Sequence, residues 1–147
     1  MMRTAIVTRP IDVAALIAEV SSVACGAVSV FLGTVREVND ARAVTGMEYT
    51  AYGPMAAREL ANIADEAGER CGGVAIAAEH RTGELGLGEV SVAIVAAHAH
   101  RAPALDATRY VIEEIKKRVP IWKREHYADG TREWVDPTLV RTTDHAR

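Results

Sequence analysis

The chain has 147 residues, a formal net charge of -3, 49% hydrophobic residues and 25% charged residues, which are ordinary values for one soluble globular domain. The acidic balance argues against general nucleic-acid binding, and no apolar run reaches the length of a membrane span. The N-terminal apolar run is too short for a signal peptide, so the expected compartment is the cytoplasm. Cys25 and Cys71 form no CxxC pair, and buried thiols are expected rather than a disulfide or redox centre.

Hydrophobic patterning predicts both strands and helices in the first half of the chain. Asp12 is suited to cap the first helix, and Pro54 is well placed near the start of the second. Residues 37–46 are polar and contain the pair Asn39-Asp40, so a mobile loop is expected there. The predicted strands cover 4–8, 26–36 and 47–52, and the predicted helices cover 12–20 and 55–70.

The second half is predicted to contain a hairpin, a helix and two short strands. The segment TGELGLG lacks the spacing of a phosphate-binding loop and is interpreted as a turn. The predicted strands cover 74–80, 89–98, 121–126 and 132–135, and the helix covers 103–118. Because strands and helices do not alternate strictly, we expect an α+β fold with a mainly antiparallel or mixed sheet. A single domain is expected over residues 1–135, followed by a polar tail at 136–147 that frays.

The densest group of cations lies in IKKRVPIWKRE at 115–125. A helix that reaches Pro120 must stop or kink, so Lys116 and Lys123 lie on two sides of a break. Two backbone segments can there direct two amines at one point, which favours an anion site in an acidic chain. Lysines in a last helical turn also complement the helix dipole, but this does not account for Lys123 and Arg124. A lysine that is crowded by cations or partly desolvated can act as acid, base or nucleophile.

Two further basic positions follow predicted strands. Arg36 could present its guanidinium fork to a phosphate or carboxylate, or it could be a solvated arginine at a strand end. His100 and Arg101 precede a helix N-terminus, where an anion pocket and a pair held by local hydrogen bonds are about equally supported. His98 and His100 have no third ligand at matching spacing, so no metal site is expected.

Five segments in a fixed order resemble the large, catalytic subunit of molybdopterin synthase. They are GAVSVFLGTVR at 26–36, MEYTAYGPMA at 47–56, EHRTGELGLGE at 79–89, HAHRAPALDA at 98–107 and IKKRVPIWKRE at 115–125. The resemblance runs from Gly26 to Val135 and is weak over 37–45, and Leu105 stands where many family members have phenylalanine. It implies an α/β-hammerhead fold and a sulfurtransferase that acts in molybdenum cofactor biosynthesis.

The resemblance also implies partners and a substrate. Family members are homodimers, and each subunit binds one small ubiquitin-like sulfur carrier, which gives a heterotetramer. The C-terminal glycine thiocarboxylate of the carrier enters a pocket on the large subunit. Two sulfurs are delivered to cyclic pyranopterin monophosphate to form the dithiolene of molybdopterin.

The resemblance assigns catalytic roles to Lys116, beside the carrier terminus, and to Lys123, the second active-site lysine. The substrate-binding residues that it implies are Thr34, Val35, Arg36, His100, Arg101, Lys116, Lys123, Arg124 and Glu125. It implies no metal and no cofactor. The lack of a convincing catalytic cysteine fits a sulfur that arrives on a partner protein.

Other classes of function remain open from the residues alone. An enzyme acting on a different phosphate ligand would use the basic cluster without a protein sulfur donor. An adaptor would only dock a ubiquitin-like tail and would bind no pterin. An interaction domain with an incidental basic corner is a third alternative, which the ordered set of matching segments disfavours.

Overall fold

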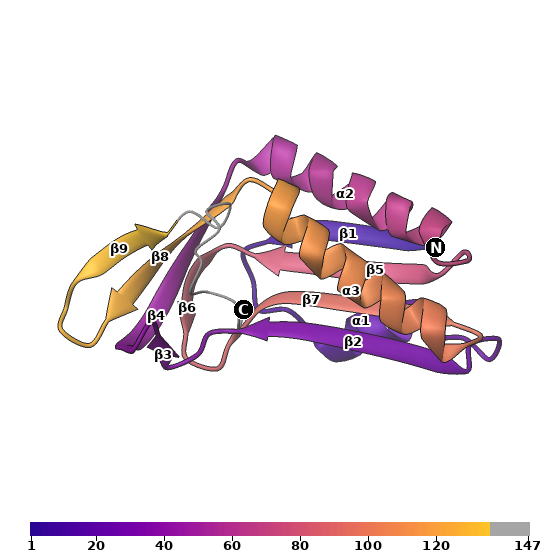
Figure 1. Cartoon of the computed structure of the whole chain (residues 1–147), viewed down its shortest axis with the longest axis horizontal. Helices are drawn as coiled ribbons and strands as arrows, with labels where there is room; N and C mark the ends of the chain where they lie inside the picture. Colours follow the sequence, from indigo (N-terminus) through magenta and orange to yellow (C-terminus); the bar gives the residue numbers. More distant parts are fainter. Residues whose placement is uncertain (136–147) are drawn as a thin grey trace.

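The structure, a computed structural model, describes residues 1–135. Its elements in chain order are β1 (Met2–Val7), α1 (Val13–Val20), β2 (Ala27–Thr34), β3 (Val38–Asn39), β4 (Arg42–Ala51), α2 (Gly53–Arg70), β5 (Ala75–Arg81), β6 (Gly83–Gly86), β7 (Val90–His98), α3 (Arg101–Arg118), β8 (Ile121–Tyr127) and β9 (Arg132–Val135) (Figure 1). The expected α+β class with mixed and antiparallel sheets is confirmed.

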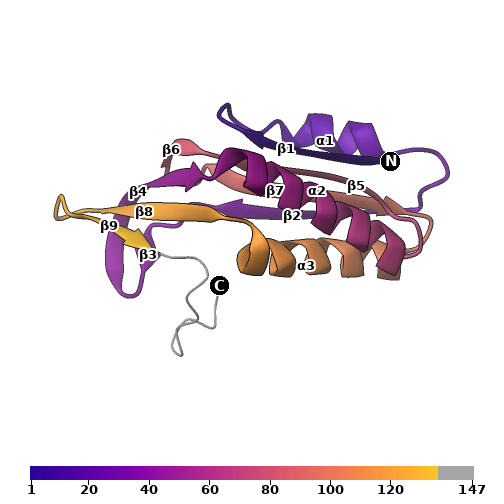
Figure 2. The same ribbon diagram turned by 90° about the horizontal axis from the view of Figure 1, so that it is seen from above.

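The larger layer is a four-stranded sheet in the order β1-β5-β7-β2. The β1–β5 pair is parallel, and the β5–β7 and β7–β2 pairs are antiparallel. Helices α2 and α3 cover one face and α1 lies on the other (Figure 2). The two central strands are therefore buried on both faces, which explains their nearly continuous apolar sequence. Ile76 and Ile94 pack in the core under α2 and α3, whereas Ala77 and Val95 pack with Leu16 of α1.

The second sheet has the order β3-β4-β8-β9, with β6 also paired to β4. It extends from one end of the larger sheet, and the chain enters it from β2 and again from α3 (Figure 1). All its strand pairs are antiparallel. The second sheet therefore meets the larger one where β2 and α3 both end.

The prediction of a mobile loop at 37–46 is wrong, because the segment forms β3 and the start of β4. Asp40 and Ala41 have φ values of 50° and 62°, and they form a tight two-residue turn between β3 and β4. Strand β4 begins at Arg42 because its first residues pair with β3 and with Tyr127 and His126 of β8. Tertiary pairing thus makes a strand of a segment whose local sequence is polar.

The other predicted helices and strands are present, and their ends agree with the structure or differ from it by a few residues. Asp12 caps α1, since its Oδ1 accepts a hydrogen bond from the Ala15 N–H at 3.1 Å. The segment interpreted as a turn at 82–88 contains the short strand β6. The polar tail at 136–147 lies outside the described residues. In the part of the chain that is described, no helix has the length and apolarity needed to cross a membrane.

Candidate functional site

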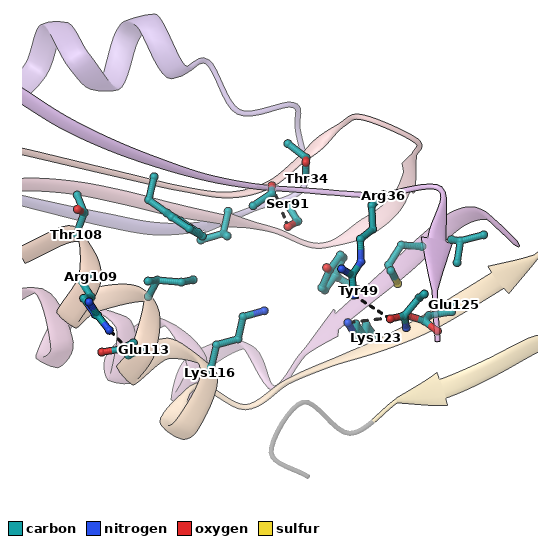
Figure 3. A pocket seen from close by; sticks show the side chains of 17 residues that line it. Thr34, Arg36, Tyr49, Ser91, Thr108, Arg109, Glu113, Lys116, Lys123 and Glu125 are labelled. Atoms are coloured by element: carbon teal, nitrogen blue, oxygen red, sulfur yellow. Dashed lines mark hydrogen bonds and ion pairs between the residues drawn. The ribbon is translucent and has the colours of Figure 1, made fainter. Parts of the chain in front are cut away.

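A cavity of ≈ 580 Å³ lies where the two sheets meet, beside the last turns of α3 (Figure 3). Its walls come from the end of β2 and from β3, β4, β7, β8 and α3. The polar side chains that line it are Thr34, Arg36, Asn39, Tyr49, Ser91, Thr108, Arg109, Glu113, Lys116, Lys123 and Glu125. The apolar part of its wall includes Phe31, Val92 and Ile112. Cations, a carboxylate and apolar surface therefore share one concave site.

Lys116 and Lys123 reach this cavity from the two sides of Pro120. Helix α3 ends at Arg118, and β8 starts at Ile121. Figure 3 shows Lys116 extending from the helix toward the side of the cavity that holds Lys123. The expectation that the proline break directs both amines to one place is confirmed.

The neighbouring cations of the same segment do not line the cavity. Lys117 is exposed and pairs with Glu114 at 3.4 Å. Arg118 binds Glu66 on α2, with 2.6 Å between Nη1 and Oε1. The hydrogen bonds from Arg118 and from the Tyr110 hydroxyl lower the pKa of Glu66 to about 2 and join the two helices. Two cations of the cluster therefore line the cavity, Arg118 holds α2 against α3, and Lys117 pairs within α3.

Glu125 lies under the cavity and is 1% exposed. Its Oε2 accepts a hydrogen bond from Asn39 Nδ2 and lies 4.0 Å from Lys123 Nζ. Its Oε1 accepts a hydrogen bond from the Tyr127 hydroxyl. Burial, together with this bond to Glu125, raises the pKa of Tyr127, which keeps the hydroxyl a donor. On its other side Asn39 accepts a bond from Arg36 Nη2 at 3.0 Å.

Arg124 and Val35, which the resemblance assigns to substrate binding, lie beside the cavity without lining it. Strand alternation turns Arg124 to the opposite face of β8 from Lys123. There its Nε donates to Glu48 at 2.9 Å. Val35 is buried and packs with Met47. The substrate-binding roles of Arg124 and Val35 stay predictions, and their contacts here are with the protein.

His100 and Arg101 lie at the other end of α3. Lys116 follows Arg101 by fifteen residues of helix, so about 22 Å separates their Cα atoms along the axis. The pair borders a separate cavity of ≈ 440 Å³ with Gly26 and Ala27. The structure therefore does not bring His100 and Arg101 to the lysine cavity within one chain.

The backbone at this helix start is held by His98. Its Nδ1 accepts from the His100 N–H at 3.0 Å, so Nε2 carries the proton and donates to Gly72 O at 3.1 Å. His100 and Arg101 are both exposed at the helix N-terminus. The start of α3 is therefore compatible with both alternatives for His100 and Arg101, an anion site and a pair held by local hydrogen bonds.

Sequence reasoning missed Asn39, Tyr49 and Tyr127. The pair Asn39-Asp40 between apolar residues is a hairpin signal that could have placed Asn39 next to a turn. Tyr49 lines the cavity and contacts the His80 ring edge-on at 5.2 Å between centroids. Burial lowers the pKa of His80 to about 4, and the charge of Lys116 acts in the same direction.

Comparison with known proteins identifies the family of the chain. Residues 6–118 match the family model described as MoaE protein. A molybdopterin synthase catalytic subunit from Halalkalibacterium halodurans is 40% identical over 141 residues, which are 96% of this chain and 90% of that protein. The solved molybdopterin synthase from Staphylococcus aureus has a TM-score of 0.84 and 38% identity, covering 89% of this chain and 95% of that one.

A third comparison concerns a protein assembly. A chain in the solved complex of subunits 1 and 2 of the molybdopterin-converting factor from Helicobacter pylori has the same fold, with a TM-score of 0.74 and 24% identity. The match covers 90% of this chain and 89% of that chain. Taken together, these matches show that the chain belongs to the MoaE family of molybdopterin synthase catalytic subunits.

Proposed function

We propose that the chain transfers sulfur from the C-terminal thiocarboxylate of a small ubiquitin-like carrier to cyclic pyranopterin monophosphate, within the lysine cavity. The observation that carries this proposal is the meeting of Lys116 and Lys123 from two sides of Pro120, with Arg36 on the same wall. Both reactants are anions. A cluster of cations in a cavity of an acidic chain attracts them and stabilises negative charge that develops during the reaction.

The position of each cation suggests its role. Lys116 extends from the end of α3, where it can orient the thiocarboxylate and assist proton transfer as sulfur attacks the pterin side. Lys123 and Arg36 hold the phosphate and the developing negative charge. Each transfer forms one carbon–sulfur bond on the pterin side in place of a carbon–oxygen bond. Water then cleaves the acyl carbon–sulfur bond and returns the carrier as a carboxylate.

The two cysteines support a sulfur source outside the chain. Cys71 is buried in the core under α2 and α3, and Cys25 packs beside α1. Neither lines the lysine cavity. Burial also raises the pKa of Cys71, which disfavours the nucleophilic thiolate. A second subunit as sulfur donor is supported by the Helicobacter pylori complex, which contains two different subunits.

The outer edge of the larger sheet supports a homodimer. Strand β2 is an edge strand, and Val28, Val30 and Leu32 project from its face opposite α3 with 40–43% exposure. An apolar edge strand without a charged residue is a template for pairing with another chain. We infer that two copies pair through β2 about a twofold axis.

This dimer would also resolve the separation of His100 and Arg101 from the lysines. The cavity that these two residues border includes Ala27, the first residue of β2, whereas Arg36 follows the last. Antiparallel pairing of two β2 strands places the first residue of one strand near the last residue of the other. His100 and Arg101 of one copy would then lie beside the lysine cavity of its partner and could hold the substrate phosphate there.

The test is reconstitution from three components: the purified chain, thiocarboxylated carrier and cyclic pyranopterin monophosphate. Dithiolene pterin, assayed as its fluorescent oxidation product, is expected only when all three are present. Turnover of the pterin without carrier would instead support an enzyme acting on a phosphate ligand alone. A stable complex with the carrier and no product would support the adaptor.

A further inference from the structure

We propose that Asn39 is a positioning residue, which aims the Arg36 guanidinium into the lysine cavity by linking it to the buried carboxylate of Glu125. The inference rests on the proposed function, since it concerns how the same cavity holds its anionic substrate. Asn39 is 5% exposed and lies at the end of β3, on the cavity wall between the two residues that it joins.

The hydrogen-bonding chemistry allows only one orientation of the Asn39 amide. A guanidinium only donates and an ionised carboxylate only accepts. The amide oxygen must therefore face Arg36, with 3.0 Å from Oδ1 to Nη2, and the amide nitrogen must face Glu125. An aliphatic side chain could make neither bond, and a carboxylate could make only the bond to Arg36. Asparagine is thus matched to a position between a cation and an anion.

The amide also acts as a spacer. Arg36 is exposed and sits just past the end of β2, so its long side chain has few other restraints. A direct pair with Glu125 would turn the guanidinium inward and use its charge on the protein. With Asn39 between them, one amine of the guanidinium is fixed and the remaining donors stay available for a phosphate.

Asn39 is itself held firmly on both sides. The turn at Asp40 and Ala41 pairs Asn39 with Arg42 across the β3–β4 hairpin. The other oxygen of Glu125 is held by Tyr127, and the Arg42 guanidinium lies over the Tyr127 ring at 3.4 Å from its centroid. The charged and titratable groups around the amide are Arg36, which follows β2, and Lys123, Glu125 and Tyr127 on β8. Arg42 of β4 lies over the Tyr127 ring, and Lys116 of α3 lines the same cavity.

The first test is Asn39→Asp, assayed over a range of pH against the parent chain. An ionised aspartate would face the Glu125 carboxylate and repel it, and the pair would bind a shared proton more tightly than a lone carboxylate. When protonated, the aspartic acid again offers one donor and one acceptor. We expect the ratio of variant to parent activity to be low at neutral pH and to rise as the pH falls.

The second test is Asn39→Ala, which removes both bonds at every pH. The loss of a charge-assisted hydrogen bond predicts a rise in KM for the pterin substrate of roughly tenfold to a hundredfold. Carrier affinity should remain close to that of the parent, and the melting temperature should fall only by the few degrees that the loss of one buried hydrogen bond costs. Asn62→Asp is the matched control, because Asn62 is exposed on α2, and it should leave both parameters and the pH profile unchanged.

These measurements distinguish a positioning role of Asn39 from a purely structural one. A pH-independent activity ratio for Asn39→Asp, or a KM for Asn39→Ala equal to that of the parent, would overturn the inference. A loss of carrier affinity in Asn39→Ala as large as the rise in KM would show that the substitution disturbs the whole cavity. That result would mean a purely structural role and would overturn the inference too.

A readout that does not depend on turnover keeps the inference separate from the proposed function. Nitrogen NMR of the Arg36 guanidinium should show slow rotation about its Nε–Cζ bond in the parent and faster rotation in Asn39→Ala. The parent chain could give no product while Asn39→Ala still speeds the rotation of the Arg36 guanidinium. The proposed function would then fail, but the inference that Asn39 links Arg36 to Glu125 would stand. An unchanged rotation rate would overturn the link itself.

Discussion

The Nζ of Lys123 lies 4.0 Å from Oε2 of Glu125, two residues further along the same face of β8. The carboxylate is 1% exposed, and the side chain of Lys123 is 13% exposed. A largely buried carboxylate therefore stands behind one of the two lysines of the cavity. It balances the lysine charge without occupying the place that an anionic substrate would take.

This arrangement predicts a large loss of stability in Glu125→Ala. The substitution leaves Lys123, Asn39 and Tyr127 without their shared acceptor, and removal of one partner from a buried ion pair costs about 3 kcal/mol. Urea unfolding should report this decrease in the free energy of unfolding. Glu133→Ala is the control, because Glu133 is exposed and pairs with Arg42 at the surface, and it should cost less than about 1 kcal/mol. Equal effects of the two substitutions would contradict the account.

The buried His80 predicts a pH dependence of stability. Its pKa is about 4 in the folded chain against 6.5 for an ordinary histidine, so below pH 6.5 the unfolded state binds a proton that the folded state does not. The free energy of unfolding should therefore fall as the pH decreases from 6.5 to 4, by about 3 kcal/mol. The contribution of Glu66 is lost only below its ordinary pKa of 4.5, in a more acidic window.

Denaturant unfolding at a series of pH values measures this slope. His80→Gln should flatten the curve between pH 6.5 and 4, whereas His126→Gln serves as a control at a histidine whose ring contacts Glu84 near the surface. A slope that persists unchanged in His80→Gln would show that another group carries it.

The proposed dimer predicts complementation between two inactive variants. If Lys116 and Arg101 of one site come from different copies, a mixed dimer of Lys116→Ala with Arg101→Ala contains one intact site. Random mixing should then restore about a quarter of parent activity, since half of the dimers are mixed and half of their sites are intact. The measurement is product formation before and after the two inactive chains are mixed and re-equilibrated. No recovery, in dimers shown to have exchanged subunits, would place both residues in the same chain's site or remove Arg101 from it.

Much of the site could be predicted because its residues carry strong local signals. Pro120 must end a helix, so the placement of Lys116 and Lys123 on two converging segments followed from backbone chemistry. The apolar run before Arg36 identified a strand, and this put Arg36 just past its end. The burial that such a run suggests is wrong, because β2 is an edge strand and none of its residues is fully buried. Alternation along β8 could also have separated Arg124 from Lys123 and Glu125, although the resemblance groups all three as substrate-binding residues.

The rest depends on contacts between distant segments. Residues 37–46 have no apolar alternation, and they form strand because β8, some eighty residues later, pairs with them. Asn39 and Tyr127 meet at Glu125 only through that pairing. His100 and Arg101 were correctly expected at a helix start, but the length of α3 carries them away from the lysines.

The most direct test of the central claim is a single-turnover assay with Lys116→Ala, in which the chain is saturated with thiocarboxylated carrier and cyclic pyranopterin monophosphate. Lys117→Ala is the matched control, since Lys117 is adjacent but exposed and paired with Glu114 outside the cavity. We expect Lys116→Ala to lose dithiolene formation while keeping carrier affinity, and Lys117→Ala to retain parent activity. Full product formation by Lys116→Ala, or an equal loss in both variants, would contradict the assignment of catalysis to the lysine cavity.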